Sequence, residues 1–429
     1  MAADLVLRGA QLLDRDAPAD IVIQDGVIVE VGSAGGRAAR ETIDLAGRVV
    51  TPGLVEAHIH LDKALLDDRV VATSGTLDEA IRVTGDAKRG FTVDDIRARA
   101  RGALDLAVRA GTTAMRTHVE VDPIVGLAGM EAVLPLRDEY RNALDLQVCA
   151  FAQEGILKAP GTEGLLRRAL TMGADLVGGC PYNDSDGAEH VRIVFALAVA
   201  FGVDADFHVD FADEPEHLHI RNVAAETLRT GWRGRVAVGH LTELAAVPPY
   251  QQSELVAEIA AAGIGVIVLP MSDLYLVGRR DELNIRRGLA PIRRLLDGGV
   301  RVALASNNLR NAFTPVGTAD LADLAFVAAV AAHMGTPADR RRLLNAITVH
   351  PAAILRLPDY GLDPGCRADL VAWDCERVDD VVAARPPRTL VVKRGRVTLQ
   401  YDAPARRALA RRAVSGRRAC YPATVAEDV

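Results

Sequence analysis

Short apolar runs alternate with amphipathic helical patterns through the middle of the chain, from about residue 51 to residue 355. Such alternation predicts parallel βα units. The segment 92–111 shows the 3.6-residue periodicity of a helix in an outer layer. The runs that predict strands are VEAHIH (55–60), TAMRTHVE (113–120), DLQVCAFA (145–152), LVGGC (176–180), DADFHVD (204–210), VAVGH (236–240), GVIVLP (265–270) and RVALAS (301–306). Eight strands of this kind predict an α/β fold with a closed (β/α)8 TIM barrel.

Two β-type regions flank the predicted barrel. Their runs are short and are separated by Gly, Asp and Pro turns, and the N-terminal runs suggest a small antiparallel unit. We expect the two chain ends to fold together into one small composite β-sandwich. The predicted division is residues 1–50 with 358–405 for the sandwich, 51–357 for the barrel, and 406–429 for a C-terminal helix or tail.

The composition of the chain limits the kinds of molecule that we expect it to bind. A length of 429 residues suits one large barrel with an accessory domain. The formal net charge of −7 argues against a nucleic-acid partner, which calls for a basic patch. The sequence shows no apolar run of about 18 residues and no secretory signal pattern, and its five cysteines are too scattered for a disulfide framework. We expect a cytoplasmic protein with a small-molecule substrate, no membrane partner and a homo-oligomeric state.

Polar residues end several of the predicted strands, at the face where barrel enzymes place their chemistry. They include His60, Glu120, Asp210, His240 and Ser306. In a strand, residues two apart point to the same side, so His58 and His60 can direct both imidazoles toward one metal ion. The alternative is that they are two ordinary polar residues at a strand end.

The segment TPGLVEAHIHLDK (51–63) resembles the first-strand motif of the amidohydrolase superfamily, in particular its bacterial cytosine deaminase-like branch. The similarity continues in the same order along roughly residues 5–400. Further matching segments are MRTHVEVDP (115–123), LQVCAFAQEGI (146–156), DFHVDFADEPE (206–216), VGHLTEL (238–244), SNNLRNAFTPVGT (306–318) and NAITVHPAAILRL (345–357). The resemblance implies a metal-dependent hydrolase of a carbon–nitrogen bond in a small cyclic amine, amide or imide.

The resemblance also assigns roles to individual residues. It implies that His58, His60 and His208 bind one divalent metal ion, zinc first and iron(II) or manganese as alternatives. It places His240 where a histidine orients the attacking water, and Gln153 where a glutamine holds the amide-like edge of the substrate ring. The alternatives are a hydrogen-bonded core histidine for His208 and a strand cap for Gln153.

The other histidines have different expectations. His118 corresponds to a position close to the family's site that does not contact the metal, so both a substrate contact and a structural role stay open. His350 matches an element that packs under the barrel. The histidines expected at the surface are His190, His217, His219 and His333.

Two departures from the family pattern fall on proton-transfer positions. Asn307 stands where the family has an aspartate that touches the metal and accepts the proton from water, so we expect it to contact the metal through its amide oxygen. Phe211 stands where cytosine deaminases have a glutamate, and it predicts an apolar wall against a ring face. Asn308 is a candidate substrate contact. An engineered substitution at Asn307 is also compatible with the sequence.

Candidates for the missing proton transfer are Asp62, Asp210 and His240. Asp210 could instead cap a loop. Lys63 could stabilise an anionic substrate or oxyanion, or could pair with Asp62 or Asp67. Two functions therefore remain: an active hydrolase, favoured by the three histidines and Gln153, and a barrel that binds a small heterocycle without hydrolysing it.

Overall fold

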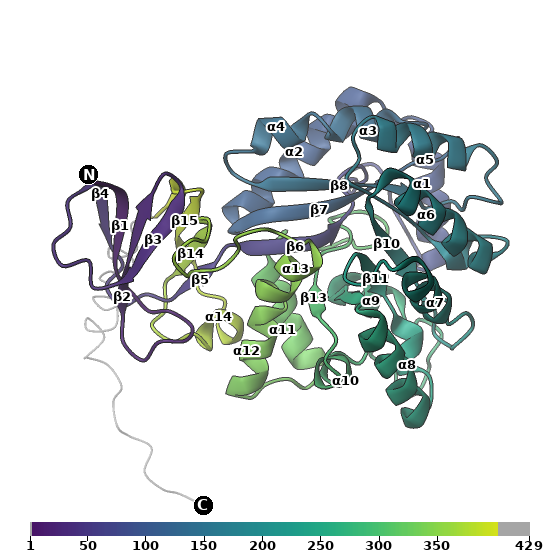
Figure 1. Cartoon of the computed structure of the whole chain (residues 1–429). Helices are drawn as coiled ribbons and strands as arrows, with labels where there is room; N and C mark the ends of the chain where they lie inside the picture. Colours follow the sequence, from purple (N-terminus) through teal and green to yellow (C-terminus); the bar gives the residue numbers. More distant parts are fainter. Residues whose placement is uncertain (1, 402–429) are drawn as a thin grey trace, which may run out of the picture.

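The computed structural model describes residues 2–401, and its centre is a parallel barrel (Figure 1). The eight strands follow one another round the sheet in chain order, from β6 to β13. They are β6 (Leu54–Ile59), β7 (Thr112–Glu120), β8 (Asp145–Ala152), β9 (Leu176–Gly179), β10 (Asp204–Val209), β11 (Val236–His240), β12 (Gly265–Val268) and β13 (Val302–Leu304). All eight predicted strands are confirmed, and so is the barrel fold.

The barrel closes where β6 meets the end of β13. Ile59 and Asn307 form a parallel bridge, in which the His60 amide donates to the Asn307 carbonyl at 2.8 Å and the Asn307 amide donates to the His58 carbonyl at 2.7 Å. Below this bridge, the Glu56 carboxylate accepts hydrogen bonds from the amide (3.1 Å) and the hydroxyl (2.5 Å) of Ser306. The contact between β6 and the segment after β13, which closes the barrel, therefore includes residues of the predicted site.

Helices cover the outside of the barrel. Helix α2 (Val93–Arg109) confirms the helix predicted over 92–111 and begins where the Thr92 side chain accepts a hydrogen bond from the Asp95 amide. The other helices are α1 (Leu77–Lys88), α3 (Ala128–Val133), α4 (Leu136–Tyr140), α5 (Thr162–Thr171), α6 (Gly187–Phe201), α7 (Ile220–Thr230), α8 (Pro249–Ala262), α9 (Pro270–Leu276), α10 (Ile292–Asp297), α11 (Leu321–Ala331), α12 (Pro337–Asn345), α13 (Val349–Ile354) and α14 (Asp380–Ala383), with 3-10 turns η1 (Pro181–Asn183) and η2 (Thr242–Ala245).

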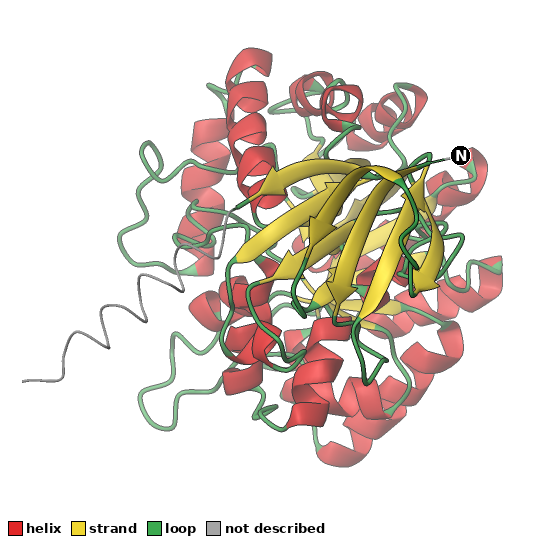
Figure 2. Cartoon of the chain, turned by 90° about the vertical axis from the view of Figure 1, so that its left-hand side faces the viewer, coloured by secondary structure: helices red, strands yellow, loops and turns green. Residues whose placement is uncertain are grey.

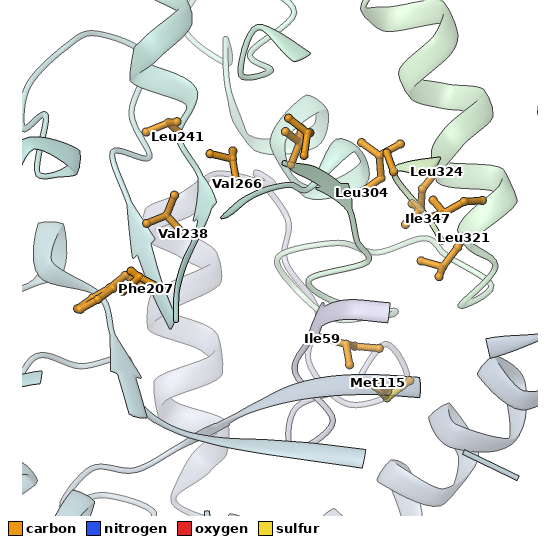
Figure 3. Packing of buried hydrophobic residues seen from close by; sticks show 14 of the residues in the cluster. Ile59, Met115, Phe207, Val238, Leu241, Val266, Leu304, Leu321, Leu324 and Ile347 are labelled. Carbon is orange, nitrogen blue, oxygen red and sulfur yellow. The ribbon is translucent and has the colours of Figure 1, made fainter. Parts of the chain in front are cut away.

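Two apolar layers hold the barrel. Outward-facing residues such as Phe207, Val238 and Leu304 pack with the surrounding helices in one continuous cluster (Figure 3). At the lower end, Ile354 of α13 packs with small and branched inward-facing residues of the strands. His350 lies on the same helix with its Nδ1 atom 3.1 Å from the Val302 carbonyl oxygen, in keeping with the expected packing role.

Both ends of the chain contribute to the second unit, a pair of four-stranded sheets (Figure 2). Their facing sides share one apolar cluster, to which Leu7 and Ile21 contribute from one sheet and Leu390 from the other. The strands are β1 (Ala3–Ala10), β2 (Ala19–Gln24), β3 (Val27–Gly32) and β4 (Ala39–Asp44) in the first sheet, and β5 (Val50–Pro52), β14 (Leu370–Trp373), β15 (Arg388–Lys393) and β16 (Arg396–Gln400) in the second. The composite sandwich is confirmed.

One detail of the sandwich differs from the expectation. Strand β4 pairs with β1 in parallel, so the N-terminal sheet is mixed and not purely antiparallel. The reason is that the last part of the N-terminal β-type region divides: β4 pairs with β1, whereas β5 crosses to the second sheet and pairs with β14. The predicted C-terminal helix or tail, 406–429, lies outside the described residues.

Among the described residues, no helix combines the length and the apolar character needed to cross a membrane. A cytoplasmic location and self-association stay predictions.

Candidate functional site

Three histidines converge at the upper end of the barrel, where the C-terminal ends of the parallel strands lie. His58 and His60 come from β6 and His208 from β10, and their ligand nitrogens all lie within 4.8 Å of one another. The Nε2 atoms of His58 and His208 are 2.7 Å apart. Burial lowers the pKa of each of the three imidazoles well below its ordinary value, so the neutral rings keep a lone pair for a metal.

Glycine 239 makes room for this arrangement. A Cβ atom at Gly239 would lie 3.0 Å from Cε1 of His58, which is tighter than ordinary contact. The neighbouring strand β11 therefore needs a residue without a side chain where the His58 ring sits.

The donor atoms are those of a metal site. Both nitrogens of His60 and the Oδ1 atom of Asn307 are buried and have no hydrogen-bond partner among the described residues. Buried polar atoms are normally paired, so several unpaired atoms at one place call for a bound group. Imidazole nitrogens with one amide oxygen suit zinc or iron(II). The residues present fit a single divalent ion.

His240 lies beside this group and is held by a buried carboxylate. Its ring centroid is 4.9 Å from that of His208, and its Nδ1 atom is 2.7 Å from Oδ1 of Asp273 in α9. The carboxylate accepts the Nδ1 hydrogen, which leaves Nε2 as the acceptor of the neutral ring. Sequence reasoning missed Asp273, whose only signal was a carboxylate three residues after the seventh predicted strand.

His118 lies against the other side of His58. The two rings stack with centroids 3.8 Å apart, and Nε2 of His118 is 3.3 Å from Oδ1 of Asp206. Arg116 donates to the second oxygen of Asp206 at 2.8 Å. This buried pair neutralises Asp206, so we assign the group a supporting place beside the metal ligands. Arg116 and Asp206 each precede a site histidine by two residues, a spacing that could have revealed them.

The charged residues after β6 form a second buried cluster. Lys63 lies 2.5 Å from Oε1 of Glu120 at the end of β7, and not against Asp62 or Asp67, the pairs the sequence suggested. Lys88 of α1 pairs with the other oxygen of Glu120. Burial raises the pKa of Asp62 to about 6, with the negative charge of Glu120 as the next cause, and Oδ2 of Asp62 accepts a hydrogen bond from the Glu120 amide at 2.8 Å.

Asp210 has the position of a cap. Its two carboxylate oxygens accept hydrogen bonds from the amides of His219 (2.6 Å) and Ile220 (3.1 Å) at the start of α7. Burial raises its pKa to about 7. Because both oxygens face backbone donors, the structure favours the loop-capping alternative over proton transfer for Asp210.

The predicted substrate contacts Gln153, Phe211 and Asn308 follow three different strands of the barrel. Gln153 directly follows β8 and is 8% exposed. Its backbone carbonyl accepts a hydrogen bond from the Asn183 side chain at 2.8 Å. The Phe211 ring lies 4.3 Å from the His240 ring. Asn308 lines a small cavity of about 110 Å³, and its Oδ1 accepts from Asn311 at 2.8 Å.

One surface expectation was wrong. His190 is fully buried in α6, with its Nδ1 atom 2.8 Å from Oδ2 of Asp184. The physical reason is the small residue opposite: a Cβ atom at Gly179 of β9 would lie 2.1 Å from Nε2 of His190. His217 and His333 are exposed, as expected, whereas His219 is half-buried.

Comparison with known proteins decides the family. The model of the amidohydrolase family matches residues 41–399. The chain belongs to this family. This amidohydrolase is 30% identical to 5-methylcytosine deaminase from Klebsiella pneumoniae, with a TM-score of 0.89 over 93% of this chain and 98% of that one. The resemblance to the cytosine deaminase-like branch is confirmed.

Two curated relatives extend the comparison. N-isopropylammelide isopropyl amidohydrolase of Pseudomonas sp. (strain ADP) is 28% identical over 405 residues, which are 92% of this amidohydrolase and 97% of that protein. Pterin deaminase of Rhizobium rhizogenes (strain K84) is 28% identical over 383 residues, 88% and 87% of the two chains. The family and these relatives make the chain a hydrolase that acts on carbon–nitrogen bonds.

Proposed function

We propose that this amidohydrolase uses one divalent ion, zinc in particular, to remove an amino or similar leaving group from a small nitrogen heterocycle or to open such a ring. The observation that carries the proposal is the convergence of His58, His60 and His208, together with buried atoms of His60 and Asn307 that find no hydrogen-bond partner in the described part of the chain. When bound, a metal of this kind acts as a Lewis acid and activates water.

The residues of the chain divide the remaining work. His240 is the proton carrier, because Asp273 fixes its Nδ1 hydrogen and leaves Nε2 as a free acceptor facing the site. Asp62, with one carboxylate oxygen unpartnered and a raised pKa, is the second candidate. Lys63 is neutralised by Glu120, so its charge supports the site indirectly.

The substrate ring is held by Gln153 and Phe211. Gln153 offers an amide to the amide-like edge of a ring, and Phe211 offers an apolar face next to His240. Because Asn307 brings no negative charge to the metal, the site favours a substrate or leaving group that carries one. The three relatives named above support a nitrogen heterocycle, since cytosine, pterin and ammelide derivatives appear in their names.

Metal content and turnover test the proposal together. Protein purified without added metal should contain about one zinc, iron or manganese per chain, and His58→Ala and His60→Ala should lose both the metal and the activity while keeping the barrel's circular dichroism. A panel of 5-methylcytosine, pterin, N-isopropylammelide and cyclic imides, followed by ammonia release and loss of ring absorbance, identifies the reaction. Stoichiometric metal with no turnover of any compound would favour the barrel that binds without hydrolysis.

A further inference from the structure

A cavity of about 380 Å³ adjoins the metal site at the upper face of the barrel. Its walls come from the start of α1, the turn η1, the loop after β10 and the end of α9. Cavities of about 300 to 1,000 Å³ are the usual size for small-molecule sites. This space is separate from the three histidines themselves, so a ring held at the metal does not account for it.

Phe211 connects the cavity with the metal site. Its ring lines the cavity and lies 4.3 Å from the His240 ring on one side and 6.3 Å from the Tyr182 ring on the other. A substrate whose reacting ring packs on Phe211 can therefore extend past that side chain and along Tyr182. The aromatic pair gives such an extension a flat, apolar floor.

His217 stands in the wall of the cavity with its orientation fixed. Its Nδ1 atom lies 2.8 Å from Oε1 of the fully buried Glu243. The other oxygen of Glu243 accepts the backbone amides of His217 (2.9 Å) and Leu218 (3.2 Å). One carboxylate thus holds both the ring and its backbone, while 30% of the His217 side chain remains exposed. Because the carboxylate takes the Nδ1 hydrogen, Nε2 is the atom left for a ligand.

The charges around the cavity favour a ligand with hydrogen-bond donors. Asp78, Asp213 and Glu216 contribute carboxylates to the wall. Two arginines, Arg279 and Arg280, also contribute, but the guanidinium of Arg279 lies 4.3 Å from the Tyr275 ring and its Nε donates to the Tyr275 carbonyl. The three carboxylates outnumber the two guanidinium groups, and this excess of negative charge suits an N–H group better than an anion.

We propose that His217, positioned by Glu243, contacts the substrate and selects nitrogen heterocycles that extend beyond one ring and carry an N–H donor at the far end. The inference rests on the proposed function, because the cavity continues from the place where that function puts the substrate ring. A ligand that covers Nε2 of His217 without donating to it would displace water and leave this acceptor unpaired, so the contact gives specificity for the longer compound with the donor.

The test compares long and short substrates in matched variants. The long substrate is guanine, whose amino group lies on one ring and whose second ring carries an N–H donor. We expect His217→Ala to lower kcat/KM for guanine by about tenfold or more, mainly through KM, and to leave kcat/KM for 5-methylcytosine unchanged. Glu243→Gln keeps an acceptor for the two amides and should give a smaller loss in the same direction. His219→Ala is the control, because the His219 ring lies 5.4 Å from that of His217 yet does not line the cavity.

Calorimetric binding of guanine to the metal-loaded protein separates this inference from the proposed function. No turnover of guanine or of any panel compound would overturn the proposed function, whereas weaker binding of guanine to His217→Ala than to the wild type would still support the role of His217. Equal Kd and equal kcat/KM in these two proteins would overturn that role. Absence of guanine binding to the wild type, or an equal loss for both substrates in His217→Ala, would overturn it as well.

Discussion

His240 and Asn307 both have a left-handed backbone conformation where their strands end, with φ angles of 72° and 59°. Asparagine tolerates this region better than most residues, whereas histidine is held there at a cost. The conformation turns the chain sharply at the upper rim of the barrel. It places the His240 imidazole beside His208 and leaves the Asn307 amide oxygen buried, with no hydrogen-bond partner among residues 2–401.

Replacing Asn307 by aspartate changes charge with little change in shape. Aspartate also tolerates the left-handed region, and the backbone bridge to Ile59 does not involve the side chain. We expect Asn307→Asp to bind the metal more tightly and to lower kcat/KM for an anionic substrate, because the added carboxylate repels it and raises the pKa of bound water. Steady-state kinetics with metal titration measures both effects.

Asn308→Asp serves as the control for this prediction. It adds the same charge one residue along, where the side-chain oxygen already accepts a hydrogen bond from Asn311, so a much smaller effect is expected. An increase of about 10²- to 10⁴-fold in turnover for Asn307→Asp, the scale of a restored general base, would show that the asparagine is a loss and not an adaptation.

At the scale of elements, α1 is attached to the barrel by one buried ammonium group. Lys88, at the end of α1, lies 3.3 Å from Asp122 and 2.6 Å from Glu154 and also pairs with Glu120. Burial alone would raise the pKa of Glu120, but Lys63 and Lys88 outweigh it and lower the pKa to about 2. The helix that borders the upper face is thus fixed by charge pairing.

Lys88→Met should therefore destabilise the protein strongly. Removing the ammonium leaves buried carboxylates without their partner, a change that costs about 3–5 kcal/mol in the free energy of unfolding. Urea denaturation measures the loss, and hydrogen exchange should show α1 opening first. Arg82→Met, which breaks only the exposed pair with Asp86 in the same helix, should change stability by less than about 0.5 kcal/mol. Similar losses in the two variants would contradict the argument.

Asp184 fixes the loop between β8 and α5. It accepts the amides of Ile156 (2.6 Å) and Lys158 (3.0 Å) and faces His190. Partial burial opposes ionisation, but hydrogen bonds from His190 and these amides outweigh it and hold the pKa below its ordinary value of 3.8. A carboxylate whose pKa is lowered by folding stabilises the folded state at any pH above its ordinary pKa. This contribution is lost as the pH falls toward and through the folded-state pKa.

The lowered pKa of Asp184 predicts how the stability of Asp184→Asn, compared with that of the wild type, changes with pH. The variant should be less stable than the wild type at neutral pH, and the difference should shrink as the pH falls from about 5 toward 3, because only the wild type loses this contribution there. Urea unfolding at a series of pH values checks the trend. A difference that stays constant over that range would show that the ionised carboxylate is not the source.

At the scale of the whole molecule, the sandwich and the barrel share buried charges. Lys393 of β15 is fully buried and lies 2.8 Å from Asp145 of barrel strand β8 and 2.6 Å from Asp369. Gly53 alone separates β5 from β6, and the Gly53 carbonyl accepts a hydrogen bond from Tyr360 at 2.7 Å. These links predict that the two units unfold together.

Lys393→Met should uncouple the two units. The two tryptophans allow a direct measurement, because Trp373 lies in the sandwich and Trp232 in the barrel. In a Trp232→Phe background, fluorescence follows the sandwich while circular dichroism is dominated by barrel helices. We expect coincident transitions with Lys393 present and separate ones in Lys393→Met. Transitions already separate with Lys393 present would contradict the coupling.

The sequence alone predicted the architecture, which is confirmed, and the three histidines that the structure brings together. Strand and helix patterns depend on local periodicity, so the alternation of β and α runs was enough to predict all eight barrel strands. The spacing of His58 and His60 is equally local, because a strand sends residues two apart to one side. His208 and the sandwich followed from the order of motifs along the chain.

The tertiary structure decided which side chains meet. Asp273 holds His240 across 33 residues and Glu120 holds Lys63 across 57, while Asp210 caps α7 and His217 turns into a cavity on Glu243. These pairs join different strand ends or loops, so they depend on the stagger of the closed barrel and on the path of each loop. Neither the stagger of the barrel nor the path of a loop follows from a periodic pattern in the sequence. For this reason the sequence suggested acidic neighbours of Lys63 as its partners and a surface position for His190.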